Sequence, residues 1–99
     1  MNGLMMDYPL TLQHFLERAG RLFPNKEIVT RTAEGTRRYR YRDFYRRTHR
    51  LAHALARLGI GRGDRVATLA WNTHQHLELY FGITCYGAVL HTLNLRLSS

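Results

Sequence analysis

The sequence is poor in cysteine, in long apolar runs and in anything typical of an export signal. Its single cysteine, Cys85, excludes an internal disulfide and fits a reducing compartment. No apolar run approaches the ~20 residues that cross a bilayer, so no transmembrane segment is expected. The first ten residues, MNGLMMDYPL, have neither a basic leader nor a long apolar centre, so a secretory signal is not predicted. Together these absences predict a cytoplasmic protein.

Acidic residues and lysine are also scarce. Seven Asp and Glu stand against fifteen Lys and Arg, for a formal charge of +8, and Lys26 is the only lysine. Arginine is dense in residues 31–57, where it alternates with tyrosine before adopting helical spacing. Such a face could bind nucleic acid or another anionic surface. The same pattern also arises from the solvated side of a strand and a helix, and we favour that interpretation.

The length and composition are those of a single folded unit. Ninety-nine residues with 44% hydrophobic content should bury roughly 65% of the unfolded surface. No internal repeat, low-complexity segment or linker divides the chain, so residues 1–99 are treated as one portion of a domain.

The first third of the chain predicts a tail, a helix and a hairpin. Residues 1–9 carry three methionines and indicate either a packing or subunit contact or a loosely ordered terminus. Residues 10–23 have the periodicity of an amphipathic helix, with Thr11 as N-cap. Its predicted apolar stripe is Leu12, Phe15, Leu16, Ala19 and Leu22. Residues 27–31 and 37–41 then read as two strands joined by a turn at Glu34-Gly35.

The middle of the chain carries the clearest helical pattern. Over residues 42–58 an apolar stripe faces away from a basic one. The stripe consists of Phe44, Thr48, Leu51, Leu55 and Leu58. Gly59 is predicted to end this helix, with Ile60 packing back against its last turn.

The last third predicts the core of the fold. Residues 65–70 and 88–93 are short apolar runs typical of strands covered on both faces, and residues 76–86 are apolar almost all round, as in a buried helix. Asn72 and Thr73 are cap-type residues, and Gly87 supplies a left-handed stop. Two strands joined by a helix should be parallel with a right-handed crossover. The fold class is therefore α/β, and because nothing after residue 93 covers the second strand, we expect a chain truncated at its C-terminal end.

Two motifs could indicate a ligand-binding site. The sequence GIGRGD at 59–64 suggests a phosphate loop, but here a helix ends and a strand begins, which is the reverse of the order that such loops require. A cap and tight turn is the favoured interpretation. His49 and His53 share a helical face and could supply two metal ligands, although no acidic residue or cysteine at matching spacing completes a set. Solvated histidines are favoured there.

Several polar residues fall on segments that are expected to be buried. His74 and His76 lie at the entry to the last helix, where they could bond backbone groups or bind a ligand. Glu78 needs a partner such as a backbone donor, a histidine or an arginine. Glu78 and His91, the latter in a strand expected to be buried, could alternatively line the wall of a larger site.

Two further residues are considered for reactivity or ligand binding. Cys85 is expected to be an inert core thiol. Trp71 follows the first parallel strand, where ligands of open α/β sheets bind, although a packing role is favoured. No catalytic triad, carboxylate pair or metal quartet can be assembled, so the residues alone indicate an α/β domain without an identifiable active site.

The order of motifs along nearly the whole chain resembles the opening of AMP-forming acyl-CoA synthetases. The matching pieces are Phe23-Pro24, YRDF at 41–44, LGIGRGDRVA at 58–67, and GAVLHTLNLRL at 87–97. Trp71-Asn72, residues 90–94 and the segment MMDYPLT at 5–11 are most similar to medium- and long-chain fatty acyl-CoA ligases, including methylthiopropionate ligases.

The resemblance implies the N-terminal scaffold of the large domain of a ligase. The full-length enzyme would use ATP, Mg²⁺ and CoA to activate a fatty or other small carboxylic acid, and would form a homodimer without nucleic acid. The family's phosphate loop, adenine segment, ribose aspartate and catalytic lysine do not occur in these residues. This chain is therefore expected to carry no catalytic, cofactor-binding or metal-binding residue and to be inactive alone.

Two alternatives remain at this point. The chain could be a small basic module that binds nucleic acid or an anionic surface through the arginine-rich 31–57 face. It could instead act only by pairing with full-length subunits.

Overall fold

The computed structural model describes residues 11–97. The chain forms three helices and four short strands, which alternate in a mixed α/β order. Their bounds are α1 Gln13–Leu22, β1 Glu27–Thr32, β2 Gly35–Arg40, α2 Tyr41–Arg57, β3 Arg65–Thr68, α3 His74–Tyr86 and β4 Val89–Thr92. Every element expected from the sequence is present. The methionine-rich tail lies outside the described residues.

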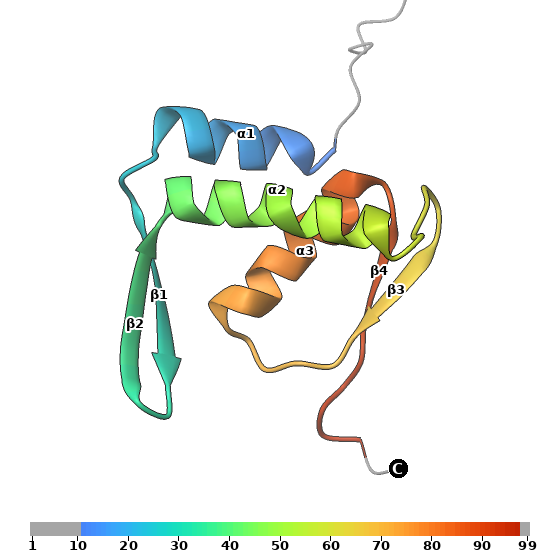
Figure 1. Cartoon of the computed structure of the whole chain (residues 1–99). Helices are drawn as coiled ribbons and strands as arrows, with labels where there is room; N and C mark the ends of the chain where they lie inside the picture. The colour runs from blue at the N-terminus through green and yellow to red at the C-terminus, as the bar shows by residue number, and fades with distance from the viewer. Residues whose placement is uncertain (1–10, 98–99) are drawn as a thin grey trace, which may run out of the picture.

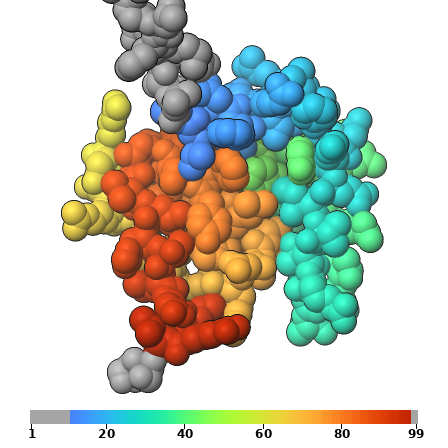
Figure 2. All heavy atoms as spheres, turned by 180° about the vertical axis from the view of Figure 1, so that it is seen from behind, coloured from blue at the N-terminus to red at the C-terminus, as the bar shows by residue number. Residues whose placement is uncertain are grey.

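The three helices form a layer that separates two small sheets (Figure 1). Helix α1 runs alongside α2, and α3 packs on α2 and also contacts α1. The β1–β2 hairpin lies at one end of this layer and the β3–β4 pair at the other. From behind, α3 occupies the centre of the molecule, with the hairpin on one side and the β4 segment on the other (Figure 2).

Helix α1 is less buried than its periodicity predicts. It begins at Gln13, with Leu12 at the N-cap position and no side-chain cap, so the prediction of Thr11 as N-cap was wrong. Of the predicted apolar stripe only Leu16 is buried, whereas Phe15 is 65% exposed and Leu22 is 61% exposed. Within residues 11–97, α2 and α3 are the elements that pack substantially on this helix, and they leave these two side chains exposed.

The hairpin follows the prediction closely. Strands β1 and β2 are antiparallel, and Thr32 pairs with Gly35 across the predicted turn. Gly35 adopts a φ of +131°, which glycine tolerates at little cost. At its open end the hairpin joins α2 through a 2.7 Å bond from the Tyr41 N–H to the Lys26 carbonyl.

Helix α2 begins and ends as its sequence predicts. At its start the Arg40 N–H donates to Asp43 Oδ2 at 3.2 Å, which satisfies a backbone donor that the helix leaves free. At its end Gly59 has a φ of +83°, and the Ile60 N–H donates back to the Leu55 carbonyl at 3.2 Å. This is the expected glycine stop with Ile60 folded against the last turn.

The last third forms the predicted parallel strand–helix–strand unit. Strands β3 and β4 pair in parallel, with Val66 opposite Leu90. Thr73 caps α3 by accepting from the His76 N–H, and Gly87 ends it with a φ of +100°. No residue from 76 to 86 is exposed, which confirms the buried helix. The main core cluster consists of Leu55 on α2, Ile83 on α3 and Ala88, which directly precedes β4.

The two strands of this unit are more exposed than predicted. Each has four residues where six were expected, and Val89 is 49% exposed. His91, predicted to be buried, is also exposed. Helix α3 packs against this strand pair, and within residues 11–97 no second layer covers it. The predicted cover on both faces is therefore wrong for this structure.

Candidate functional site

A buried carboxylate joins three elements of the molecule. Glu78 on α3 is 6% exposed. Arg47 on α2 donates from its Nε to both Glu78 carboxylate oxygens, at 2.8 and 3.1 Å. Tyr39 on β2 donates its hydroxyl to Glu78 Oε1 at 3.1 Å. The carboxylate thus binds the hairpin to both long helices, and one of the partner types expected from the sequence, an arginine, is confirmed.

The titration of this cluster follows from its burial. Burial, and then the charge of Glu78, raise the pKa of the Tyr39 hydroxyl well above its ordinary value. The hydrogen bond and charge of Glu78 raise the pKa of Arg47. Both groups therefore keep their protons at neutral pH and act as donors. This arrangement is suited to holding elements together, because the Tyr39 hydroxyl and the Arg47 Nε–H both donate to the one carboxylate of Glu78.

His74 lies beside this cluster without joining its hydrogen bonds. Its ring makes an edge contact with Tyr39 at 5.2 Å between centroids. Its backbone N–H donates to Thr30 Oγ1 at 3.1 Å, while both ring nitrogens are buried without a partner in the described chain. Burial lowers the pKa of His74. His74 is therefore held as a neutral ring that packs the start of α3 on the hairpin.

His76 has a different partner on the other side of α3. Its Nε2 lies 3.0 Å from the Thr68 hydroxyl at the end of β3, and its ring stacks on Tyr80 at 4.6 Å between centroids. The expectation that these two histidine rings bond backbone groups at the helix entry was wrong. Instead, the Thr68 hydroxyl lies within hydrogen-bond distance of the His76 ring, and the Thr30 hydroxyl accepts a hydrogen bond from the His74 backbone N–H.

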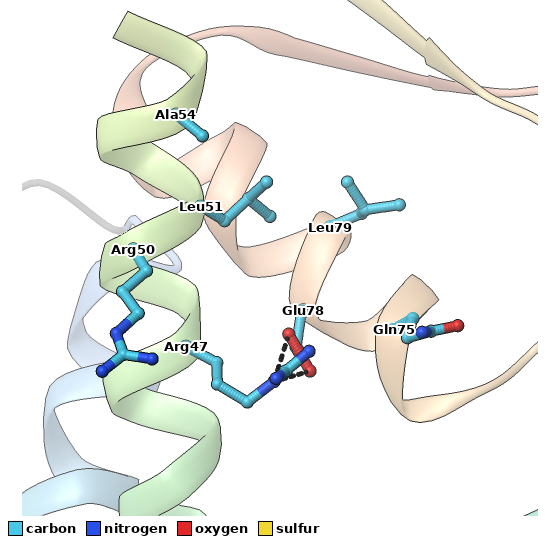
Figure 3. A pocket seen from close by; sticks show the side chains of 7 residues that line it. All are labelled: Arg47, Arg50, Leu51, Ala54, Gln75, Glu78 and Leu79. Atoms are coloured by element: carbon cyan, nitrogen blue, oxygen red, sulfur yellow. Dashed lines mark hydrogen bonds and ion pairs between the residues drawn. The ribbon is translucent and has the colours of Figure 1, made fainter. Parts of the chain in front are cut away.

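An open groove runs between α2 and α3 beside Glu78 (Figure 3). Its volume is about 410 Å³. Figure 3 shows Arg47 and Glu78 meeting across the gap between the helices, with Arg50 extending along α2. The lining residues are Arg47, Arg50, Leu51, Ala54, Gln75, Glu78 and Leu79.

A second hollow, of about 540 Å³, lies at the carboxyl ends of β3 and β4. Trp71 lines it and is 68% exposed. The structure thus gives Trp71 little of the packing role that was favoured and leaves it in the position expected for a ligand contact. Asn72, Asn94 and Arg96 also line this hollow.

The phosphate-loop interpretation of residues 59–64 has no geometric support. The Gly61 N–H donates to Asp64 Oδ2 at 2.6 Å. The Gly63 N–H donates to the Gly87 carbonyl oxygen at 2.9 Å, and the Asp64 N–H donates to the Gly61 carbonyl oxygen at 3.1 Å. Because these amides are bonded within the protein, they are not free to hold a phosphate. The segment is the cap and tight turn that was favoured.

The remaining candidates do not form a metal centre. His49 and His53 are exposed on α2, and the His49 ring contacts Tyr45 at 4.4 Å between centroids. Between residues 11 and 97 no group of three or more His, Cys, Asp or Glu side chains could hold a metal ion. Cys85 is half-buried, and burial raises the pKa of its thiol, which fits the unreactive thiol expected from the sequence.

Sequence reasoning missed the partners that the hairpin supplies. Tyr39 was interpreted only as one member of an alternating strand, and Thr30 was not singled out. The one signal that could have found Tyr39 was the isolated carboxylate of Glu78 in an apolar helix, which requires donors from elsewhere in the chain.

Comparison with known proteins gives a consistent result. Residues 16–99 match the family described as AMP-binding enzyme. The chain is 53% identical over 95 residues to a long-chain-fatty-acid–CoA ligase from Thermus thermophilus, covering 95% of this chain and 18% of that protein. It is 38% identical over 98 residues to a 3-methylmercaptopropionyl-CoA ligase from Ruegeria lacuscaerulensis, covering 98% of this chain and 18% of that protein.

Solved structures agree with these relatives. A Mycobacterium tuberculosis fatty acyl CoA synthetase superposes with a TM-score of 0.79 at 28% identity, over 89% of this chain and 17% of that one. A protein described as a putative long-chain-fatty-acid CoA ligase from Rhodopseudomonas palustris gives a TM-score of 0.76 at 36% identity, over 92% of this chain and 22% of that one. The chain thus spans about a fifth of the proteins that it matches. By its matched residues and its fold, the chain belongs to the AMP-binding enzyme family.

Proposed function

We propose that residues 1–99 are the N-terminal scaffold portion of the large domain of an AMP-forming fatty acyl-CoA ligase. The observation that carries this proposal is the 53% identity over 95 residues to a long-chain-fatty-acid–CoA ligase. The fold agrees, because the same helices and strands superpose on a fatty acyl CoA synthetase.

The full-length enzyme would join a carboxylic acid to CoA while ATP is converted to AMP and pyrophosphate. It would need ATP, Mg²⁺ and CoA. Residues 59–64 do not fit a phosphate group, since the amides of residues 59–61, 63 and 64 are bonded internally, and no metal-binding cluster is present between residues 11 and 97. We propose that this chain supplies no catalytic, cofactor-binding or metal-binding residue, because the motifs that carry those roles in the family do not occur in its sequence.

The substrate class rests on the relatives. Their printed names include ligases for long-chain and medium-chain fatty acids and for 3-methylmercaptopropionate. A fatty acid is the proposed substrate, because the relative with 53% identity acts on long-chain fatty acids. We further propose a cytoplasmic homodimer. No helix within residues 11–97 has the length and apolar character needed to cross a membrane.

The proposal is tested by ATP–pyrophosphate exchange. The purified 99-residue chain should show no exchange with any fatty acid. A longer protein that contains these residues should catalyse exchange with a fatty acid and then release acyl-CoA. Exchange by the 99-residue chain alone would contradict the scaffold role, and a longer protein inactive on every carboxylic acid would contradict the ligase assignment.

The rival interpretation, a nucleic-acid or anionic-surface module, receives no support from the family match or the relatives. The arginine face is also partly neutralised, since Arg38 pairs with Glu27 and Arg46 with Asp43, each at 3.0 Å. A module that neutralises about five phosphates would show log K falling with a slope near −4.5 against log salt. A scaffold should bind DNA negligibly at physiological ionic strength.

A further inference from the structure

The groove between α2 and α3 combines an apolar floor with a cationic edge. Leu51, Ala54 and Leu79 supply the apolar part, and Arg50 and Arg47 lie beside it. Its volume of about 410 Å³ falls in the range of ~300–1,000 Å³ that small-molecule pockets occupy.

The charges at this groove do not cancel. Glu78 is neutralised by Arg47 and also accepts from Tyr39. Arg50 is exposed and has no carboxylate or hydrogen-bond partner among residues 11–97. One guanidinium therefore remains available next to an apolar surface. A guanidinium presents a fork of donors that matches both oxygens of a carboxylate.

We propose that this groove binds an amphiphilic carboxylate, with its aliphatic chain along the Leu51–Leu79 side and its carboxylate on Arg50. Charge complementarity selects a single anionic head, because one arginine is free. The apolar floor selects an alkyl chain over a purely polar anion such as inorganic phosphate. This inference rests on the groove alone and does not require the proposed ligase activity.

The test is photoaffinity labelling with decanoate that carries a diazirine near the end of its chain. The intact protein that contains these residues is irradiated with the probe, digested and mapped by peptide mass spectrometry. Labelling is expected on the peptide that spans residues 75–79. Decanoate should compete with the probe, and decanol, which lacks the carboxylate, should compete at least tenfold more weakly.

Two pairs of variants isolate the charge. Arg50→Gln should raise the half-saturating probe concentration about tenfold or more, the change expected for loss of ~1.4 kcal/mol, whereas Arg57→Gln, at an exposed arginine on the same helix outside the groove, should leave it unchanged. Ala54→Glu places a carboxylate one helical turn from Arg50 and should weaken labelling far more than Ala54→Gln, which has nearly the same size.

Three results would overturn the proposal. These are labelling that maps away from α2 and α3, equal effects of Arg50→Gln and Arg57→Gln, or equal competition by decanol and decanoate. Circular dichroism of each variant separates loss of binding from loss of fold. If the protein is an active ligase but is not labelled here, the carboxylate-binding proposal is refuted and the proposed function stands. If it is labelled here but has no ligase activity, the proposed function is refuted and the carboxylate-binding proposal stands.

Discussion

The helical layer and the β3–β4 pair are neighbours in the chain, yet they are stabilised in different ways. In the helical layer Ile83 is fully buried and Glu78 has its hydrogen-bond partners on two other elements. In the strand pair the backbone ladder is formed, but Val89 is 49% exposed and Leu93, directly after β4, is 44% exposed. The contact between α2 and α3 therefore buries an apolar core residue and a paired carboxylate within this chain. The strand pair does not, which fits a sheet that continues elsewhere in a larger domain.

The sharpest test of this contrast compares one large apolar residue from each region. Ile83→Ala should lower the free energy of unfolding by about 3 kcal/mol, because it leaves a cavity in the core. Leu93→Ala, directly after β4, should cost only about 1 kcal/mol, since the residue is 44% exposed. Urea unfolding of the 99-residue chain measures both. Equal losses would show that the strand pair is as well packed as the helical layer.

The next largest effect concerns the buried ion pair. Glu78→Ala should cost about 2–3 kcal/mol, because it removes the acceptor of both Arg47 and Tyr39. The value is at the low end for buried pairs because the Arg47 side chain is 43% exposed. Glu27→Ala breaks the exposed pair with Arg38 and should cost at most about 0.5 kcal/mol. Similar losses for the two variants in urea unfolding would contradict a special role for Glu78.

A smaller effect isolates the hairpin contact. Tyr39→Phe should cost about 1 kcal/mol, the usual net value of one hydrogen bond. The raised pKa of Tyr39 also predicts alkaline sensitivity, since above about pH 10 the unfolded tyrosine loses a proton that the folded one keeps. The stability difference between the parent chain and Tyr39→Phe should therefore shrink between pH 9 and pH 11. A constant difference would be inconsistent with the Tyr39–Glu78 contact.

The last expected effect is at acid pH. Burial lowers the pKa of His74, so below about pH 6.5 the unfolded chain binds a proton that the folded chain resists. Stability should fall by less than about 1.4 kcal/mol from this source between pH 7.5 and pH 5.5. His74→Gln should flatten that decline, and His53→Gln, at an exposed position on α2, should keep it. Identical pH profiles for the two variants would remove His74 as the cause.

Local features of this fold could be read from the sequence. The helical period of residues 42–58 and the glycines at 35, 59 and 87 determine structure through their own backbone preferences. The predicted ends therefore fall within a few residues of the observed ones. The family could also be inferred, because its motifs are contiguous in the chain.

Long-range partners and burial could not be read in this way. Tyr39 and Glu78 are 39 residues apart, and Thr30 and His74 are 44 apart. Whether they meet depends on how the hairpin packs on α3, which no periodicity encodes. The exposure of Phe15 and His91 was missed for a related reason. An apolar or strand-like pattern shows that a face can be buried, but another element has to cover it.

The most direct test of the proposed scaffold role is the intact mass of the native product. It can be detected in its own cells with an antibody raised against residues 11–23. The account predicts a protein about five times the 11.6 kDa of this chain, because the chain spans 18% of the Thermus thermophilus ligase. A stable native species of 11.6 kDa would contradict it.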